Sequence, residues 1–199
     1  MVGSFPFSWY FAHVVASTCL ILSVYFTLVK PRPLLSGLFF SFAFLTRISV
    51  SLGVIFFLSY YFIFEKKIFI KRVVRFVIPV FFGILIFFWY NYARFGNIFE
   101  TGYKYQIMGI PEVVASRDIG MWSLKHFPTN LYLFLLKTPI LIYADGSKVI
   151  QGIRPSHWGM SFLFTTPVLL LILFSDIKNK LNIISLFSAF SIAVFLFGS

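Results

Sequence analysis

Acidic residues and cysteines are scarce in this sequence. Its 199 residues include 6 Asp and Glu against 17 Lys and Arg, and a single cysteine, Cys19. One cysteine excludes an intramolecular disulfide and a cysteine-based metal site. The 3 histidines are scattered along the chain, so a histidine-based metal site has little support either. We therefore expect neither a metal nor a cofactor.

Sequence motifs of soluble enzymes are also missing. The chain has no Walker loop, no Gly-rich dinucleotide turn, no His-Glu-x-x-His pair and no Ser/His/Asp constellation. The formal net charge of +11 could suggest nucleic-acid binding. However, the basic residues cluster between apolar runs instead of forming one face, so nucleic acid is not an expected partner. The sequence leaves the catalytic residues unknown.

Apolar and aromatic residues are present in large excess. Hydrophobic residues make up 59% of the chain and charged residues 12%, which lies outside the usual range of soluble domains. The 29 phenylalanines exceed what one soluble core of this size would use. The composition predicts an all-α transmembrane protein, multi-pass in the cell membrane, with the lipid bilayer as its first partner.

Basic segments set the predicted topology of the first half. Residues 9–29 form an apolar run long enough to cross a hydrocarbon core of ~30 Å. The segments 30–33 and 65–73 carry the basic residues that the positive-inside rule places in the cytoplasm. The nearly uncharged segment between them would measure ~46 Å as one helix, too long for an untilted span. We therefore predict a short hairpin of two helices, 34–46 and 49–64.

The second half is predicted to continue the same pattern. Residues 74–92 form a span that Pro79 and Gly83 are expected to bend. An extracytoplasmic loop, 93–157, follows and contains an interfacial helix near 128–143. Two more spans are expected at 158–174 and 182–198. The complete prediction is one membrane domain over residues 1–199 with about six membrane helices.

An aromatic stretch, residues 88–105, lies where the 74–92 span meets the outer boundary of the membrane. Its Trp and Tyr rings are of the amphipathic kind that settle at headgroup level. Arg94 and Glu100 lie among these rings and could face a charged headgroup or a sugar. Gly96 and Gly102 are expected to let the backbone turn where the helix stops. The simpler interpretation is an aromatic anchor followed by a loop.

Arg47 is the most informative single residue of the hairpin. It is predicted at the extracytoplasmic end, where an arginine is costly unless it is paired or functional. The alternative is an arginine whose side chain snorkels to the interface. Guanidinium groups bind phosphate in a bidentate manner, so an anionic lipid phosphate would suit this side. The candidate substrate-binding residues there are His13, Arg47, Arg94, Glu100, Tyr103 and Arg117.

Three stretches resemble polytopic membrane glycosyltransferases of the GT-C superfamily, which are related to the protein O-mannosyltransferases. They are Gly37 with Phe-Ala-Phe-Leu-Thr-Arg at 42–47, the Arg94–Asn97 and Glu100–Tyr103 runs, and Gly159-Met160-Ser161 followed by Pro167. The resemblance implies a GT-C-like core. It also implies transfer of a sugar from a polyprenyl-phosphate donor to an acceptor at the extracytoplasmic face.

The resemblance lacks one expected part. Such enzymes carry their acidic catalytic residue in the first extracytoplasmic loop, and this chain begins with what looks like the helix beyond that loop. We therefore expect an incomplete fragment, with a separately encoded N-terminal portion as a candidate partner. Enzymatic activity stays open. A membrane transporter and a non-catalytic membrane assembly subunit stay open as alternatives.

Overall fold

The computed structural model describes residues 7–102, 105, 123–143, 150–154, 161, 176 and 178–197. The chain divides into two compact units. Unit 1 comprises Met1–Met108 with Ile183–Ile192, and unit 2 comprises Gly109–Asn182 with Ala193–Ser199. The main helices are α1 (Phe7–Leu28), α2 (Pro33–Thr46), α3 (Val54–Phe64), α4 (Phe69–Phe95) and α8 (Lys180–Phe197). That unit 1 and unit 2 form one membrane domain stays a prediction.

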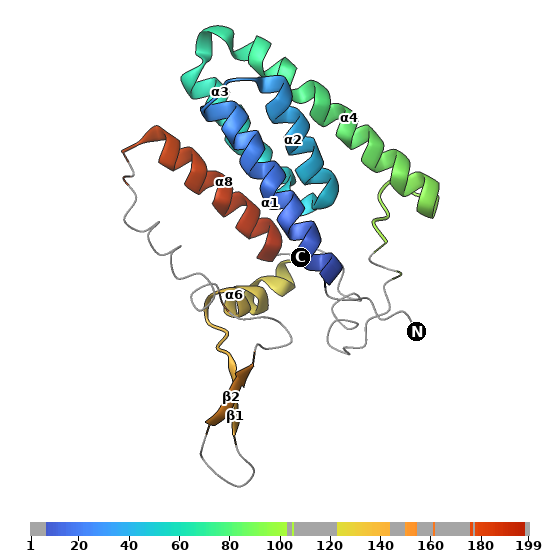
Figure 1. Cartoon of the computed structure of the whole chain (residues 1–199), viewed down its shortest axis with the longest axis vertical. Helices are drawn as coiled ribbons and strands as arrows, with labels where there is room; N and C mark the ends of the chain where they lie inside the picture. Colours follow the sequence, from blue (N-terminus) through green and yellow to red (C-terminus); the bar gives the residue numbers. More distant parts are fainter. Residues whose placement is uncertain are drawn as a thin grey trace. The chain divides into compact units, whose positions relative to one another are not determined.

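Unit 1 begins with α1 to α4, which pack side by side (Figure 1). Pro33 stands in the first turn of α2, where its missing N–H leaves no helical hydrogen bond unmade. At the other end of α2, Arg47 has extended backbone, with φ −145° and ψ 108°. A short 3₁₀ helix, η1 (Ile48–Gly53), then leads into α3. Thus α2 and α3 occupy the two segments predicted as a short hairpin; their entry into a membrane stays a prediction.

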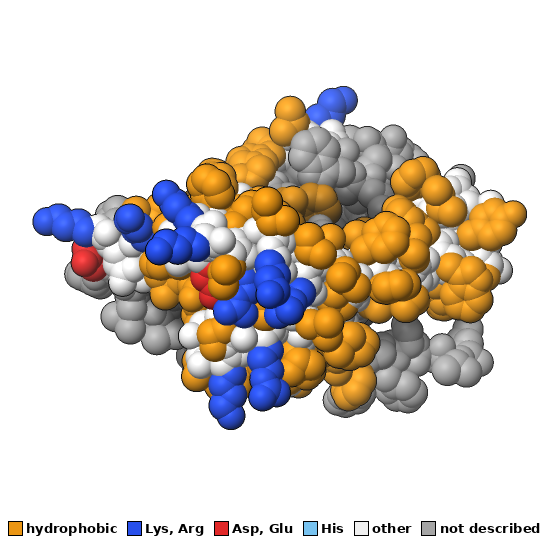
Figure 2. All heavy atoms as spheres, turned by 90° about the horizontal axis from the view of Figure 1, so that it is seen from above, with side chains coloured by type: hydrophobic (Ala, Val, Ile, Leu, Met, Phe, Trp, Pro, Cys, Tyr) orange, Lys and Arg blue, Asp and Glu red, His pale blue; other side chains and the backbone are white. Residues whose placement is uncertain are grey.

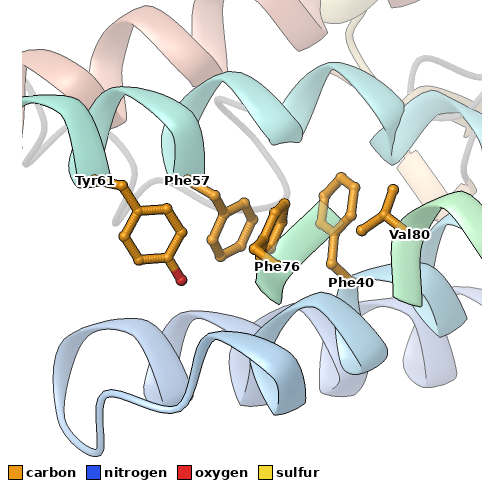
Figure 3. Packing of buried hydrophobic residues seen from close by; sticks show 5 residues of the cluster. All are labelled: Phe40, Phe57, Tyr61, Phe76 and Val80. Atoms are coloured by element: carbon orange, nitrogen blue, oxygen red, sulfur yellow. The ribbon is translucent and has the colours of Figure 1, made fainter. Parts of the chain in front are cut away.

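The hydrophobic core of unit 1 lies between α2, α3 and α4. It consists of five buried side chains (Figure 3): Phe40, Phe57, Tyr61, Phe76 and Val80. The Phe57 and Phe76 rings stack with centroids 4.9 Å apart, and Phe40 meets Phe57 edge-on at 5.2 Å. These distances fall in the favourable range for aromatic pairs. Four of the five core residues are aromatic, which accounts for part of the phenylalanine excess.

Small residues bring α2 and α4 into close contact. A Cβ atom added at Gly37 would collide with the carbonyl oxygen of Phe76, and one added at Gly83 would collide with Ser41 Oγ. Farther along, the Phe44 and Phe87 rings lie 5.4 Å apart. The contacting residues advance together along both helices, so α2 and α4 run parallel. Close backbone approach through small residues is typical of helix pairs in membranes.

Hydroxyl groups join the basic end of α1 to the start of α2. Ser23 and Ser36 each donate from the side-chain hydroxyl to the other's carbonyl oxygen, at 2.8 and 2.9 Å. Thr27 Oγ1 lies 2.7 Å from Ser36 Oγ. The Tyr61 phenol is buried, and Figure 3 shows it pointing from α3 toward the helices drawn in blue. A buried hydroxyl cluster therefore connects α1 to α2.

Unit 2 contains a helix and a β-hairpin. The helix α6 (Phe127–Leu135) follows a 3₁₀ turn, η4 (Leu124–His126). The strands β1 (Ile140–Tyr143) and β2 (Ile150–Arg154) are antiparallel, with Ile140 opposite Arg154 and an irregularity between Ile142 and Tyr143. The all-α prediction is therefore wrong in this segment.

The predicted interfacial helix at 128–143 is also wrong in its second half. The helix ends at Leu135, and Pro139, which cannot donate a helical hydrogen bond, precedes the strand. Ile-Leu-Ile-Tyr at 140–143 has the β-branched and aromatic character that favours strands. Ser161 N donates to the Lys137 carbonyl at 3.0 Å, next to the point where the helix stops. Apart from Ser161, the predicted span 158–174 lies outside the described residues.

Two of the described helical segments are long and apolar enough to cross a membrane. They are Phe11–Leu28 and Lys66–Phe95, and only 17% of the most apolar 18-residue stretch in each is buried within the protein. The helix of a soluble core would instead be mostly buried. Pro33–Thr46, Ile48–Phe64 and Lys180–Leu196 are apolar but shorter. The described part of the chain is thus mostly helical, with two candidate membrane-crossing helices; the number of six membrane segments stays a prediction.

Candidate functional site

His13 and Arg47 lie at the same end of unit 1. His13 is exposed on α1, and Arg47 caps α2, where its backbone N–H donates to the Ala43 carbonyl at 2.9 Å. The Arg47 side chain is partly buried, with Nε fully covered, and its charge is close enough to act on the His13 imidazole. The structure therefore brings together two of the predicted site residues from different helices.

The Arg94 side chain lies against its own helix. Its Nη1 donates to the Tyr90 hydroxyl at 2.9 Å, and the guanidinium carbon lies 5.8 Å from the Tyr90 ring centre and 5.1 Å from that of Phe95. Tyr90 and Arg94 are four residues apart, so both face the same side of α4. Arg94 is exposed. This geometry agrees with the aromatic-anchor interpretation.

Two glycines turn the chain after α4, as predicted. Gly96 has φ 69°, and its N–H donates to the Tyr92 carbonyl at 2.8 Å, which is the left-handed cap that glycine favours. The buried Asn91 side chain donates from Nδ2 to the Ile98 carbonyl at 3.1 Å, tying the loop to the helix. Gly102 has φ 85°.

Glu100 shapes the loop beyond this turn. Its Oε1 accepts a hydrogen bond from the Gly102 N–H at 3.0 Å. A Cβ atom at Gly102 would lie 2.6 Å from Phe95 Cζ, so a larger residue there would require the Phe95 ring to move. The Tyr105 ring stacks on Phe95 at 5.6 Å. No ion pair joins Glu100 to Arg94.

Register places Arg47 near the aromatic end of α4. Because Phe44 meets Phe87 and the helices run parallel, Arg47 falls at the level of Tyr90 and Asn91. Arg94 lies about one further turn along, ~5 Å at ~1.5 Å per residue. That Arg47 and Arg94 share one outer cavity stays a prediction. Two other candidates, Tyr103 and Arg117, lie outside the described residues.

Sequence reasoning did not predict the burial of the polar residues Asn91, Ser23 and Ser36. Ser23 and Thr27 are four residues apart within an apolar run, a spacing that places both on one helix face. That pattern could have indicated an interhelical contact. Asn91 carried no comparable signal, because its partner, the Ile98 carbonyl, depends on how the following loop folds back.

The described residues contain no group of three His, Cys, Asp or Glu side chains that could hold a metal ion. Comparison of the chain with models of protein families, with curated proteins and with solved structures finds no match. The resemblance to GT-C glycosyltransferases therefore stays a prediction.

Proposed function

We propose that unit 1 is embedded in a lipid bilayer as part of a multi-pass protein of the cell membrane. The proposal depends on where apolar and polar side chains lie in unit 1, which is the reverse of their usual distribution in a soluble protein. Phe81, Phe82 and Trp89 on α4 are 54 to 69% exposed. Meanwhile Ser23, Thr27, Ser36, Ser41 and Asn91 are buried between helices. Both observations are expected if the hydrocarbon core of a bilayer surrounds unit 1, because large apolar side chains then face lipid and polar side chains form hydrogen bonds inside the protein.

The charge distribution along unit 1 gives the proposed orientation. Basic residues gather around the start of α4 and the α1–α2 turn, and Figure 2 shows such side chains clustered on the face viewed. The positive-inside rule places that end in the cytoplasm. The Arg47 end, with His13 and the aromatic end of α4, then lies on the extracytoplasmic side.

The proposed activity is that of a membrane glycosyltransferase: sugar transfer from a polyprenyl-phosphate donor at the extracytoplasmic face. Two observations support it. The resemblance stretches include Arg47 and Arg94, and Arg47 has a partly buried guanidinium at a helix end, close to His13. A guanidinium in such a site is suited to a lipid-linked phosphate. Exposed aromatic rings near the level of Arg47, such as Trp89 and Tyr90, would lie among the lipid headgroups.

The acceptor-activating base is not assigned within the described residues. Transfer to a hydroxyl needs a carboxylate within hydrogen-bond reach of the acceptor proton. Glu100 uses one oxygen to hold the Gly102 turn, which suits a shaping role. The other acids of the predicted outer loop, Glu112, Asp118 and Asp145, lie outside the described residues. Donor binding is therefore the property to measure first.

Binding of a polyprenyl phosphate by the purified protein in detergent tests the donor site. Arg47→Gln should weaken binding by ~1.5–3 kcal/mol, the scale of a hydrogen bond to a charged group. Arg47→Lys should restore part of it, because an ammonium lacks the planar fork. Lys67→Gln removes an equal charge from an exposed position at the opposite end and should leave affinity unchanged. Equal affinity of the Arg47→Gln variant and the parent would refute the proposed donor site.

A further inference from the structure

The cytoplasmic end proposed for unit 1 contains an open pocket of about 540 Å³ between the starts of α2 and α4. Its lining comes from the α1–α2 turn, the first turn of α2 and the first two turns of α4: Pro31, Arg32, Pro33, Leu34, Leu35, Arg72 and Arg75. Three of these seven residues are arginines, and the rest are apolar. The pocket lies at the opposite end of α2 from Arg47, so it is separate from the proposed donor site.

The three arginines are not equivalent. Arg72 Nε pairs with Glu65 Oε2 at 2.7 Å, and its Nη1 donates to the Pro31 carbonyl at 3.2 Å. These two contacts hold the α1–α2 turn against α4. Arg32 and Arg75 are exposed, and no carboxylate among the described residues forms an ion pair with either. The pocket therefore has one arginine engaged in holding the turn and two whose charge is available to an anion.

The surroundings of the pocket indicate that the anion is attached to hydrocarbon. Leu34 at its rim is 51% exposed. On α4, Ile78, Phe82 and Leu85 follow Arg75 by three, seven and ten residues, which places all of them on the same side of the helix. These three side chains are 45 to 59% exposed. An apolar stripe thus runs from the arginine pocket along the helix toward the middle of the proposed membrane span.

We infer that this pocket binds the phosphate diester of an anionic glycerophospholipid in the cytoplasmic leaflet, with an acyl chain along the Ile78–Leu85 stripe. Guanidinium groups bind phosphate in a bidentate manner, and basic pockets between membrane helices are suited to anionic headgroups. A free phosphate ion would use the arginines but gain nothing from the stripe. The inference depends on the membrane placement of unit 1 and not on sugar transfer.

Native mass spectrometry of the full chain in micelles with equal phosphatidylglycerol and phosphatidylcholine tests this site. The parent protein should retain phosphatidylglycerol preferentially. Arg32→Gln and Arg75→Gln should each lower its retention about tenfold or more, because each loses a hydrogen bond between charged groups worth ~1.5–3 kcal/mol, at tenfold per 1.4 kcal/mol. Lys67→Gln removes the same charge outside the pocket and should change retention less than twofold. Arg75→Lys should also lower retention, since it keeps the charge but loses the planar fork.

Three results would overturn the inference. Equal losses in Lys67→Gln and Arg75→Gln, with none in Arg75→Lys, would indicate diffuse surface charge instead of a pocket. Displacement of phosphatidylglycerol by millimolar inorganic phosphate would indicate an anion site without a lipid component. No preference for phosphatidylglycerol in the parent would exclude the site outright. None of these results would affect polyprenyl-phosphate binding at Arg47, so failure of this inference and failure of the proposed donor site are distinguishable.

Discussion

The contact between α2 and α4 can be tested by adding one methyl group at Gly37. The new Cβ would collide with the Phe76 carbonyl oxygen and lie 2.8 Å from Pro79 Cγ and 2.9 Å from the Phe76 carbonyl carbon. Two of these three atoms are backbone and the third belongs to a proline ring, so no flexible side chain can move aside. The two helices must therefore separate where they now touch.

The expected cost of Gly37→Ala to the free energy of unfolding follows from two losses and one gain. Overpacking a tight contact costs ~1–3 kcal/mol, and a rigid backbone neighbour favours the upper part of that range. A shift of ~1 Å also loses a quarter to a half of the dispersion energy of each contact it opens. Alanine recovers ~1 kcal/mol over glycine within a helix. We expect a net loss of about 2 kcal/mol in the free energy of unfolding.

Gly53→Ala provides the matched control. Gly53 is also buried, but a Cβ atom there would meet its nearest neighbour, Phe40 Cε2, at an ordinary 3.5 Å. Its backbone, with φ −60° and ψ −18°, suits alanine. This change should stabilise by ~0.4–1 kcal/mol through the unfolded state. The assay is dodecyl sulfate unfolding in mixed micelles, followed by circular dichroism. A Gly37→Ala variant as stable as the parent would refute the α2–α4 packing.

Two further changes test local features of unit 1 in the same assay. Ser36→Ala should lower the free energy of unfolding by ~0.6 kcal/mol, and at most by about 1.7, because it removes hydrogen bonds that join α1 to α2. Ser49 is half-buried, so Ser49→Ala is the control. If both variants are equally stable, the hydroxyl cluster is contradicted. Gly96→Ala should cost ~1–2 kcal/mol from left-handed backbone alone, since nothing lies within 4 Å of the added Cβ. Gly96→Asn should cost less, because asparagine tolerates left-handed backbone better than alanine does. A Gly96→Ala variant as stable as the parent would refute the left-handed cap of α4 at Gly96.

Local chemistry made several features predictable from the sequence. Gly96 and Gly102 were expected at the turn after α4, and both have positive φ. The basic segment 30–33 was expected to separate two helices, and α1 ends at Leu28 while α2 begins at Pro33. α4 starts at Phe69, five residues before the predicted span, because its basic residues are good helix formers and continue the helix beyond the apolar run.

Contacts between distant segments could not be predicted in the same way. The register of α2 against α4 depends on Gly37 meeting the Phe76 carbonyl, and the apolar pattern alone does not fix which small residues meet. The 128–143 segment was misassigned because its apolar composition suits a helix and a strand alike. Pro139 and the β-branched residues after it favour the strand that the structure contains.

The candidate site was partly predictable. The hairpin topology placed Arg47 at the same end as His13, and the structure has them close together. By contrast, the anchoring of Arg94 on Tyr90 is a contact within one helix that a four-residue spacing could have indicated. The pocket at Arg32, Arg72 and Arg75 needed the structure, because its residues come from two segments about forty positions apart.

Accessibility of single cysteines in intact cells tests the membrane placement of unit 1 most directly. Lys67 and Asn97 are both exposed and lie near opposite ends of α4. The test uses Lys67→Cys and Asn97→Cys, each introduced separately into a Cys19→Ala variant. An impermeant thiol reagent should label the Asn97 site in intact cells and the Lys67 site only after the membrane is opened. Labelling of both sites in intact cells, or of Lys67 alone, would contradict the account.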